Sequence, residues 1–365
     1  MSLSIRISAK NLSSSRIIPV RDNYTINFFN FSAIGGSKQA RITIESNDLP
    51  SLLTYLQLLR NPIEIVSEAG VTLWNGYISE TLLNYGAISI GLSLNEMANT
   101  IGVEFSYVAA GSQTVGERMT TTYATDATST SIYGIKELLI SKSGMSTEQA
   151  NSLRDIELAS RKYPVPISKI NGQGENNSIT LECYGWFNTL DWRTCVNNST
   201  TSVETTTQIS NIITNTGQFF NTVFIINPSG ISSSQYKAGD KTCLEEITTM
   251  LETGTSNGKR LLIKTDEKRN VRIYAEPSYD IKTTYQFTND GILLTPQGTP
   301  IIPYSAPVGV YARMRDIGQY FMGIQRIVDP SLVFIEELEY GSSPNDIRFT
   351  LKNALGLGSL GIIRI

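Results

Sequence analysis

The stretch SGMSTEQANSLRDIELASRKYPVPIS, residues 143–168, predicts a helix between two strand-forming regions. Ser146 with Gln149 three residues later forms a capping box, and Met145 and Ala150 occupy the positions of a hydrophobic staple. The apolar spacing predicts one buried face and one solvated face. The residues expected inside are Ala150, Leu153, Ile156 and Ala159, and those expected in water are Arg154, Asp155, Glu157 and Arg161. Pro164 disfavours helical geometry at Tyr163, so the helix must end there.

Strand patterns surround this helix on both sides. LSIRISAK (3–10), YTINFFNF (24–31) and ARITIE (40–45) alternate apolar and polar residues between turn residues, as half-buried strands do. PIEIVSEAGVTLWNGYIS (62–79) predicts a hairpin that turns at Ala69-Gly70. Between them, DLPSLLTYLQLLRNP (48–62) predicts a short helix that Asp48 caps and that covers one face of the strands. The chain is therefore α+β and predominantly β.

The second half of the chain also combines short capped helices with strands. TTTQISNIITNTG (205–217) predicts a helix with Ile209, Ile212 and Ile213 inside, and GDKTCLEEITTMLETG (239–254) predicts one that Asp240 caps and Gly254 ends. RLLIKTDEKRNVRIYAEP (260–277) predicts a hairpin. Residues 105–135 are polar and weakly periodic, which indicates a long loop or linker. A weak echo between VTLWNGYISETL (71–82) and ITLECYGWFNTL (179–190) leaves duplication an open alternative.

These patterns predict five parts. They are a β-barrel-like domain with one covering helix (1–104), a linker and helical connecting module (105–172), strands of a second barrel (173–204), a small α/β module (205–280) and a C-terminal β segment that completes the barrels (281–365). At 365 residues the chain is long enough for several packed units. No apolar run reaches the length of a membrane span, and the first residues lack a secretory pattern, so we expect synthesis in a cytoplasm.

The composition excludes several kinds of chemistry. The chain contains no histidine, which removes the Ser-His-Asp, Cys-His and His-zinc classes of site. Three widely spaced cysteines, Cys183, Cys195 and Cys243, argue against a disulfide framework or a thiolate metal site, so we expect small core or strand residues. The net charge of −3 argues against dedicated nucleic-acid binding.

The remaining motifs favour structural interpretations. GLGSLG (356–361) matches a dinucleotide-binding pattern but lacks room for the following helix, and GTSNGKR (254–260) is one residue short of a phosphate loop. Glu336, Glu337 and Glu339 are the carboxylates that a glycosidase would use, yet neighbours on one strand point to opposite faces. The basic residues of the second hairpin predict a soluble tip or an inter-subunit surface: Lys259, Arg260, Lys264, Lys268, Arg269 and Arg272. We predict no catalytic, cofactor or metal residue.

The order of several motifs resembles the hub proteins of phage tails, over residues 40–280. It comprises T-L-W-x-G-Y-I (72–78), S-I-Y-G-I-K-E (131–137), R-D-x-x-L-A (154–159), P-x-P (164–166), ITLECYGWFNTLDW (179–192) and Y-K-A-G-D-K-T-C-L-E-E-I (236–247). The resemblance covers the trimeric baseplate hub of contractile tails and the N-terminal hub part of tail-associated proteins in long non-contractile tails.

This resemblance implies a structural virion protein, made in the bacterial host cytoplasm, without enzymatic activity. It implies a homotrimeric ring of two tail-tube-like barrels per subunit at the distal end of the tail, which adapts the tube to a central spike or fibre and gates the passage of DNA. The implied partners are other copies of the chain, the tail tube or distal tail ring protein, and a spike, fibre or tape-measure protein; DNA would pass without specific contacts. Penetration would belong to a separate chain.

Alternatives remain open. One is the hexameric distal tail ring protein, which also carries an N-terminal barrel and differs in stoichiometry. The others are a carboxylate-based glycosidase and a carbohydrate-binding tail protein. The last is disfavoured because Trp74, Trp186 and Trp192 lie in apolar strand patterns that predict burial.

Overall fold

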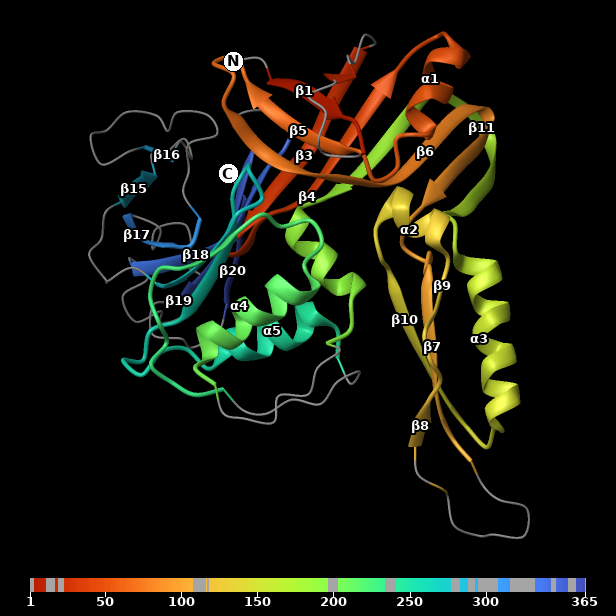
Figure 1. The fold of residues 1–365 in the computed structure, drawn as a ribbon. Coiled ribbons are helices and arrows are strands. Elements are labelled where there is room, and N and C mark those ends of the chain that lie inside the picture. Colours follow the sequence, from red (N-terminus) through yellow and green to blue (C-terminus); the bar gives the residue numbers. More distant parts are fainter. Residues whose placement is uncertain are drawn as a thin grey trace.

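A computed structural model describes the greater part of the chain. The described residues are 3–10, 17–18, 23–107, 116, 118–195, 203–233, 241–276, 283–287, 293–294, 308–315, 332–342, 346–353 and 359–364. They form a strand-rich molecule with helices at its margins (Figure 1), which confirms the predicted predominantly β, α+β class.

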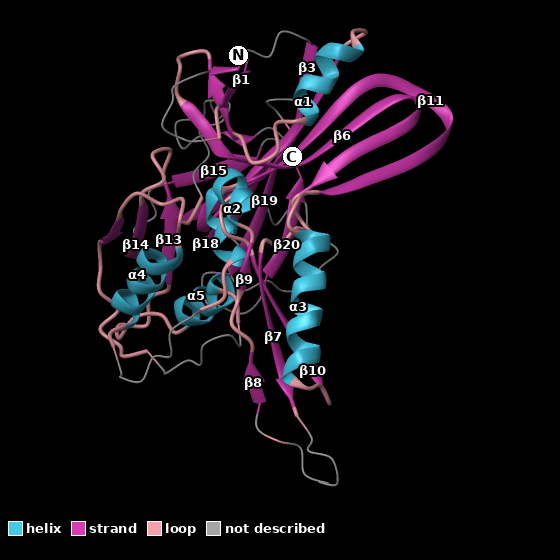
Figure 2. Ribbon diagram, turned by 45° about the vertical axis from the view of Figure 1, so that its right-hand side comes forward, coloured by secondary structure: helices cyan, strands magenta, loops and turns pink. Residues whose placement is uncertain are grey.

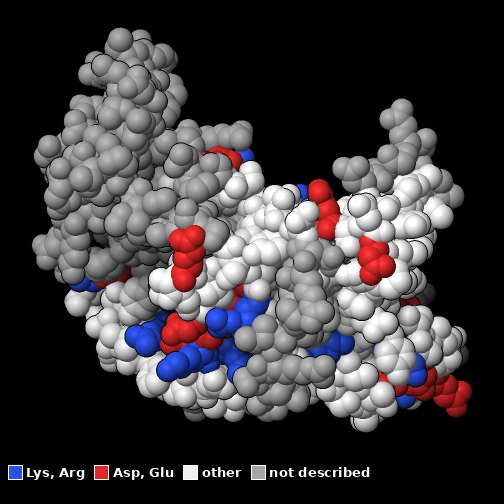
Figure 3. Space-filling view, turned by 90° about the horizontal axis from the view of Figure 1, so that it is seen from above, with Lys and Arg blue, Asp and Glu red and all other residues white. Residues whose placement is uncertain are grey.

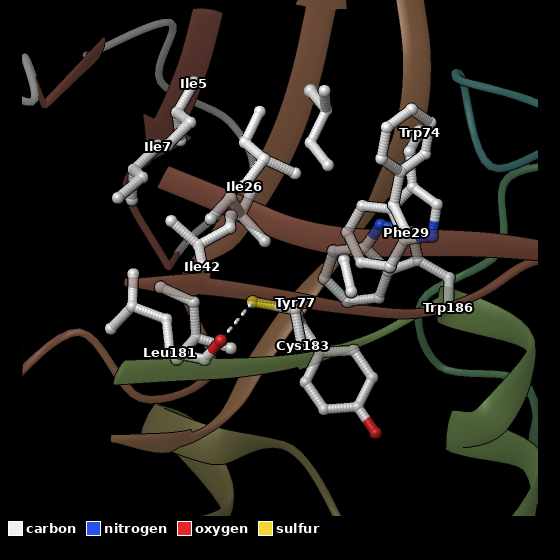
Figure 4. Packing of buried hydrophobic residues seen from close by; sticks show 14 of the residues in the cluster. Ile5, Ile7, Ile26, Phe29, Ile42, Trp74, Tyr77, Leu181, Cys183 and Trp186 are labelled. Carbon is white, nitrogen blue, oxygen red and sulfur yellow. Dashed lines mark hydrogen bonds between the residues drawn. The ribbon is translucent and has the colours of Figure 1, made fainter. Parts of the chain in front are cut away.

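The N-terminal strands form a rolled antiparallel sheet. Its strands follow the order β3–β4–β11–β6–β5–β1–β2, with β1 (Leu3–Ser8), β2 (Ile17–Ile18), β3 (Asn23–Ser32), β4 (Ile34–Glu45), β5 (Pro62–Ser67), β6 (Thr72–Ser93) and β11 (Val165–Tyr184). Alternate side chains from these strands meet in one core, where Ile5, Ile26, Ile42, Trp74 and Leu181 lie together (Figure 4). The predicted hairpin over 62–79 is confirmed by the β5–β6 pairing, with Gly70 at a positive φ of 77°.

Helix α1 (Leu49–Leu56) covers this core as predicted. The Asp48 carboxylate accepts a hydrogen bond of 3.1 Å from the backbone N–H of Ser51, and Pro50 lies in the first turn. Leu52 and Tyr55 are the buried residues of the helix.

Strands β6 and β11 continue beyond the sheet as a long two-stranded ribbon (Figure 2). They pair from Tyr77 opposite Tyr184 to Ser93 opposite Val165, with register shifts on the way. The ribbon bends back on itself, so that two positions of β6 ten residues apart come close together. A Cβ at Gly91 would lie 2.5 Å from the carbonyl oxygen of Thr81, and glycine permits this approach. The predicted boundary between 172 and 173 therefore falls inside β11, a strand of the N-terminal sheet. Of the two echoing segments, residues 77–82 of β6 pair antiparallel with residues 180–184 of β11, whereas residues 186–190 form part of a 3₁₀ helix.

Residues 98–162 form what we call the arm, which leaves the sheet between β6 and β11. It contains β7 (Thr100–Ser106), β8 (Arg118–Thr120), β9 (Ala124–Thr125), α2 (Ala127–Tyr133), β10 (Glu137–Ser143) and α3 (Thr147–Arg161), and the sheet order is β10–β7–β8 with β9 also on β7. The prediction of a long loop over 105–135 was wrong for its described part, which contains β8, β9 and α2. Its polar side chains bond locally: the Asp126 carboxylate caps α2, and the Thr130 and Ser131 hydroxyls donate hydrogen bonds to the carbonyl oxygens of Ala127 and Thr128.

Helix α3 begins as predicted but presents another face. The capping box of Ser146 and Gln149 is present, and the helix ends at Arg161 before Pro164. The predicted buried stripe was right for Ala150, which is fully buried, and for Leu153, which packs beside it. It was wrong for Ile156, which is 63% exposed, and for Ala159, which is also exposed. The arm is a thin layer, so the inward face packs mainly against β7 and β9. Arg154, which we expected in water, lies on that face and donates a 2.9 Å hydrogen bond to the carbonyl oxygen of Thr122.

The α/β module follows β11. It contains the 3₁₀ helix η1 (Trp186–Trp192), α4 (Thr205–Thr216), β12 (Val223–Ile225), α5 (Cys243–Glu252), β13 (Leu261–Thr265) and β14 (Val271–Ala275). The predicted helices and hairpin are confirmed, with Ile209, Ile212 and Ile213 buried. The predicted cap Asp240 was wrong, because Thr242 caps α5 in a capping box with Glu245. Trp186 and Trp192 are buried as expected, but on η1 and not on a strand.

The C-terminal strands extend the rolled sheet through β18. They are β15 (Thr283–Phe287), β16 (Leu293–Leu294), β17 (Val310–Arg315), β18 (Leu332–Tyr340), β19 (Ile347–Asn353) and β20 (Ser359–Arg364), and β18 pairs with β3. Across the described residues, no helix is both long enough and apolar enough to cross a membrane.

Candidate functional site

An aromatic cluster joins the sheet, the arm and the α/β module. Tyr77 of β6, Trp186 and Trp192 of η1, and Phe219 after α4 have ring centroids 5.3–5.8 Å apart. All four side chains are at most 6% exposed. The arm approaches through Gly134, where a Cβ would lie 2.5 Å from the Phe219 ring. Trp192 packs edge-to-face against Tyr77 and Phe219, and Trp186 lies tilted against the same two rings. Aromatic packing of this kind is directional, so it fixes the three parts relative to one another.

Tyr77 contributes a neutral polar group to this aromatic junction. Its hydroxyl accepts a 3.2 Å hydrogen bond from the side-chain amide of Asn188. Burial raises the pKa of Tyr77 far above that of a free phenol, so the hydroxyl keeps its proton across the physiological range.

A buried carboxylate fastens the arm to the module. Glu137, at the start of β10, accepts 2.8 Å hydrogen bonds from the Arg193 guanidinium and from the Thr194 backbone N–H. It also accepts one of 2.9 Å from the Thr194 hydroxyl. The Arg193 and Glu137 side chains are 14% and 6% exposed. Both oxygens of the Glu137 carboxylate accept hydrogen bonds, and these bonds compensate the cost of removing the ion pair from water.

Lys136 adds a second polar contact beside it. Its ammonium donates hydrogen bonds to the carbonyl oxygens of Leu94 and Asn95 and lies 5.8 Å from the centroid of the Trp192 ring. Burial lowers the pKa of Lys136 to about 8. The arm is therefore held to its surroundings mainly by charged and polar groups.

The structure disperses the carboxylates singled out as glycosidase candidates. Glu337 pairs with Lys38 at 2.5 Å and Glu339 with Arg348 at 2.8 Å, across neighbouring strands. Glu336 lines a separate open hollow of about 690 Å³, together with Glu252, Lys259 and Arg260. The three side chains thus do not converge on one cleft.

The glycine-rich motifs also have structural roles where they are described. Gly254 ends α5 at a φ of 70° and Gly258 turns at 71°, as expected for GTSNGKR as a helix end and turn. Of GLGSLG, residues 359–361 begin β20, and residues 356–358 lie outside the described part.

The cysteines are buried, as predicted. Cys183 lies in β11, and burial raises the pKa of its thiol. Cys195 and Cys243 meet in the module with their sulfur atoms 3.5 Å apart, a proximity that their 48-residue separation did not reveal. No group of three or more possible metal ligands occurs among the described residues.

The basic residues of the β13–β14 hairpin are partly neutralised. Arg260 pairs with Glu276 at 3.9 Å and Arg272 with Asp266 at 3.6 Å, whereas Lys264 and Lys268 are exposed. Among the described residues on the face shown in Figure 3, acidic and basic side chains lie next to each other. This distribution does not favour binding of a long polyanion.

Comparisons with known proteins place phage tail proteins beside this chain. No family model matches the sequence, and no curated protein matches it. Among solved structures, a 43 kDa tail protein of prophage MuSo2 from Shewanella oneidensis is 8% identical, with 97% of this chain and 99% of that chain covered and a TM-score of 0.47.

Two further solved structures of tail proteins are also similar to this chain. A tail protein from Neisseria meningitidis MC58 is 8% identical, with coverage of 98% and 94% and a TM-score of 0.40. Prophage tail protein gp18 from Listeria monocytogenes EGD-e is 10% identical, with coverage of 97% and 95% and a TM-score of 0.41. Phage tail proteins are also the group that the sequence motifs resemble. At these identities and TM-scores the comparisons assign neither a family to the chain nor a role to any residue.

Proposed function

We propose that the protein is a structural component of a phage tail, a tail-tip or baseplate hub that assembles into a ring at the distal end of the tail tube. In this proposal it adapts the tube to a central spike or fibre and gates the passage of DNA. The partners are further copies of the chain, the tube or distal ring protein above, and a spike, fibre or tape-measure protein.

The observation that carries the proposal is the set of apolar side chains exposed on projecting strands. Tyr85, Ile88 and Ile90 on the ribbon of β6 are 44%, 51% and 46% exposed. Phe224 and Ile225 of β12, with Ile226 next to them, are exposed on the module, and β12 has one described neighbour, β14. Apolar side chains clustered on projecting ribbons and edge strands are typical of assembly surfaces.

Native mass spectrometry of the purified protein tests the assembly. We expect three copies per ring, whereas six would favour the hexameric distal tail ring. Ile88→Asp places a charge on the ribbon and should dissociate the ring while circular dichroism stays unchanged. Val71→Asp, at a 57% exposed position in the β5–β6 turn, is the matched control. A protein that stays monomeric at every concentration and is absent from virions would contradict the proposal.

We also propose that the protein acts without catalysis. Incubation with purified peptidoglycan or capsule should release no reducing ends. Release that Glu336→Gln abolishes would revive the glycosidase alternative. Because the chain has no histidine, ring integrity should be constant from pH 5 to 8, and a transition in that range would argue against an assembly held by these surfaces.

A further inference from the structure

Two arginines differ from every other described arginine whose side chain can be placed. Arg60 and Arg269 have no carboxylate of the described residues within ion-pair distance, whereas each of the others has one: Arg6, Arg41, Arg118, Arg154, Arg161, Arg193, Arg260, Arg272 and Arg348. The same two are the non-glycine residues of the described chain with positive φ, 66° and 61°. Such backbone conformations cost energy and persist where the surroundings enforce them.

The two arginines lie against the same aromatic pair. The Arg60 guanidinium is 4.9 Å from the centroid of the Phe219 ring and that of Arg269 is 5.7 Å from that of Trp186, while these rings are 5.4 Å apart. The Asn221 backbone N–H and side chain donate hydrogen bonds to the carbonyl oxygens of Arg269 and Lys268, which ties the Phe219 turn to the hairpin. The positions of both cations are therefore fixed by packing.

Lys10 completes a cluster of three cations. Arg60 donates a 2.5 Å hydrogen bond to the Lys10 carbonyl oxygen, and the Lys10 ammonium lies 4.9 Å from the centroid of the Tyr133 ring. Burial and the charge of Arg269 lower the pKa of Arg60 to about 10, and burial and the charge of Arg60 lower the pKa of Lys10. Like charges thus gather here, and no acidic side chain of the described residues forms an ion pair with any of the three.

The hydrogen bonding of Arg60 shows what the cluster lacks. Arg60 is 5% exposed, and its Nε and Nη1 atoms are buried without any hydrogen-bond partner. A buried charge with unused donors is destabilising unless an anion compensates it. Lys10 and Arg269 are half-buried and reach the surface, so an anion can contact them directly. Arg60 then contributes its charge from the interior, where solvent screens it least.

We propose that Lys10, Arg60 and Arg269 form a binding site for a carboxylate carried by an acidic segment of a partner protein. The mixed charges of the surface and the net charge of −3 disfavour a nucleic-acid backbone, which needs an extended positive track. A single planar carboxylate fits a compact cluster of guanidinium and ammonium groups walled by aromatic rings. The site lies where the sheet, the arm and the module converge, so its occupant would contact all three.

The test uses the full chain and a tetraglutamate peptide, with tetraglutamine as the uncharged comparison. Trp186 lies beneath Arg269, so tryptophan fluorescence reports binding. Wild-type protein should give a saturable change with tetraglutamate alone. Lys10→Gln and Arg269→Gln should each weaken binding by roughly 10-fold or more, because each removes a charged contact. Arg272→Gln, an exposed arginine on the same hairpin that already pairs with Asp266, should leave it unchanged.

Three results would overturn the proposal. They are no response of the wild-type protein, an equal loss in Arg272→Gln, and sulfate binding as tightly as the peptide at matched ionic strength. The last would indicate a site for a free anion and not for a polypeptide carboxylate. Arg60→Gln removes the buried charge and can disturb folding, so the two half-buried variants decide the outcome.

Discussion

The arm and the α/β module are of comparable size but are stabilised in different ways. In its described part, the module has a core of fourteen buried apolar residues, which come from η1, α4, α5, β13 and β14 and include Cys195. The arm has a cluster of three, Val103, Phe105 and Ala150. It depends instead on the Glu137 and Lys136 contacts at its base. Hydrophobic burial scales with area, so the module should hold its shape alone while the arm is held by its attachment.

The largest expected effect tests the difference in cores directly. Ile247→Ala in α5 removes a fully buried side chain and should lower the free energy of unfolding by about 3–4 kcal/mol. The same change at Ile156 of α3, which is 63% exposed, should cost less than about 0.5 kcal/mol. Urea unfolding followed by circular dichroism measures both, and equal losses would refute the contrast.

The next prediction concerns the attachment. Glu137→Ala leaves Arg193 buried without its partner and should cost about 3 kcal/mol. Hydrogen exchange should speed up in β7 and β10 before it changes in α5. Glu104→Ala is the control, because its partner Arg118 is 69% exposed and such pairs contribute about 0–1 kcal/mol. Faster exchange throughout the molecule would show that the arm does not open independently.

A smaller effect is expected within the arm. Arg154→Ala removes the hydrogen bond to the Thr122 carbonyl oxygen and should cost about 1–1.5 kcal/mol. Because this bond lies between α3 and the segment before β9, the loss should appear as faster exchange there. Arg154→Lys, which keeps the charge, should recover part of the lost stability.

The smallest effect belongs to the module and depends on pH. Burial acts to raise the pKa of Glu204, but hydrogen bonds from Ser229, Thr206 and Thr207 outweigh it and lower the pKa to about 2. The folded pKa is below the unfolded value of about 4.3, so this stabilisation is present above about pH 4.5 and is lost as the pH falls toward 2. Since Glu204 is partly exposed, the loss should be about 1 kcal/mol. Urea midpoints at pH 7 and pH 3 should therefore differ less in Glu204→Gln.

Capping residues and proline positions in the sequence predicted where helices begin and end. Which helix face is buried depends on tertiary packing and was predicted only in part for α3. Asp48, Ser146 with Gln149, and Pro164 act through neighbours in sequence, so the limits of α1 and α3 followed from them. The buried face of α3 depends on how much surface the arm offers, which no local pattern contains. Both Asp240 and Thr242 are residue types that cap helices, so the sequence alone did not decide which of them begins α5; in the structure it is Thr242.

The aromatic junction was visible only in part. The burial of Trp186 and Trp192 was predicted, but Phe219 and Glu137 come from distant segments and were not singled out. The two arginines without an ion-pair partner among the described residues could be recognised only after the partners of the other described arginines were known. Absence of a charge partner is a property of the fold, and a sequence without a contact map does not contain it.

The register of β6 and β11 has a consequence for how this chain could diversify. Ser93 lies opposite Val165, so the arm leaves and re-enters the sheet at adjacent points. A tight turn could join these two residues without moving either strand, and a different insert could occupy the same gap. Related proteins could therefore carry different domains in place of the arm, while the sheet of β6 and β11 keeps its structure.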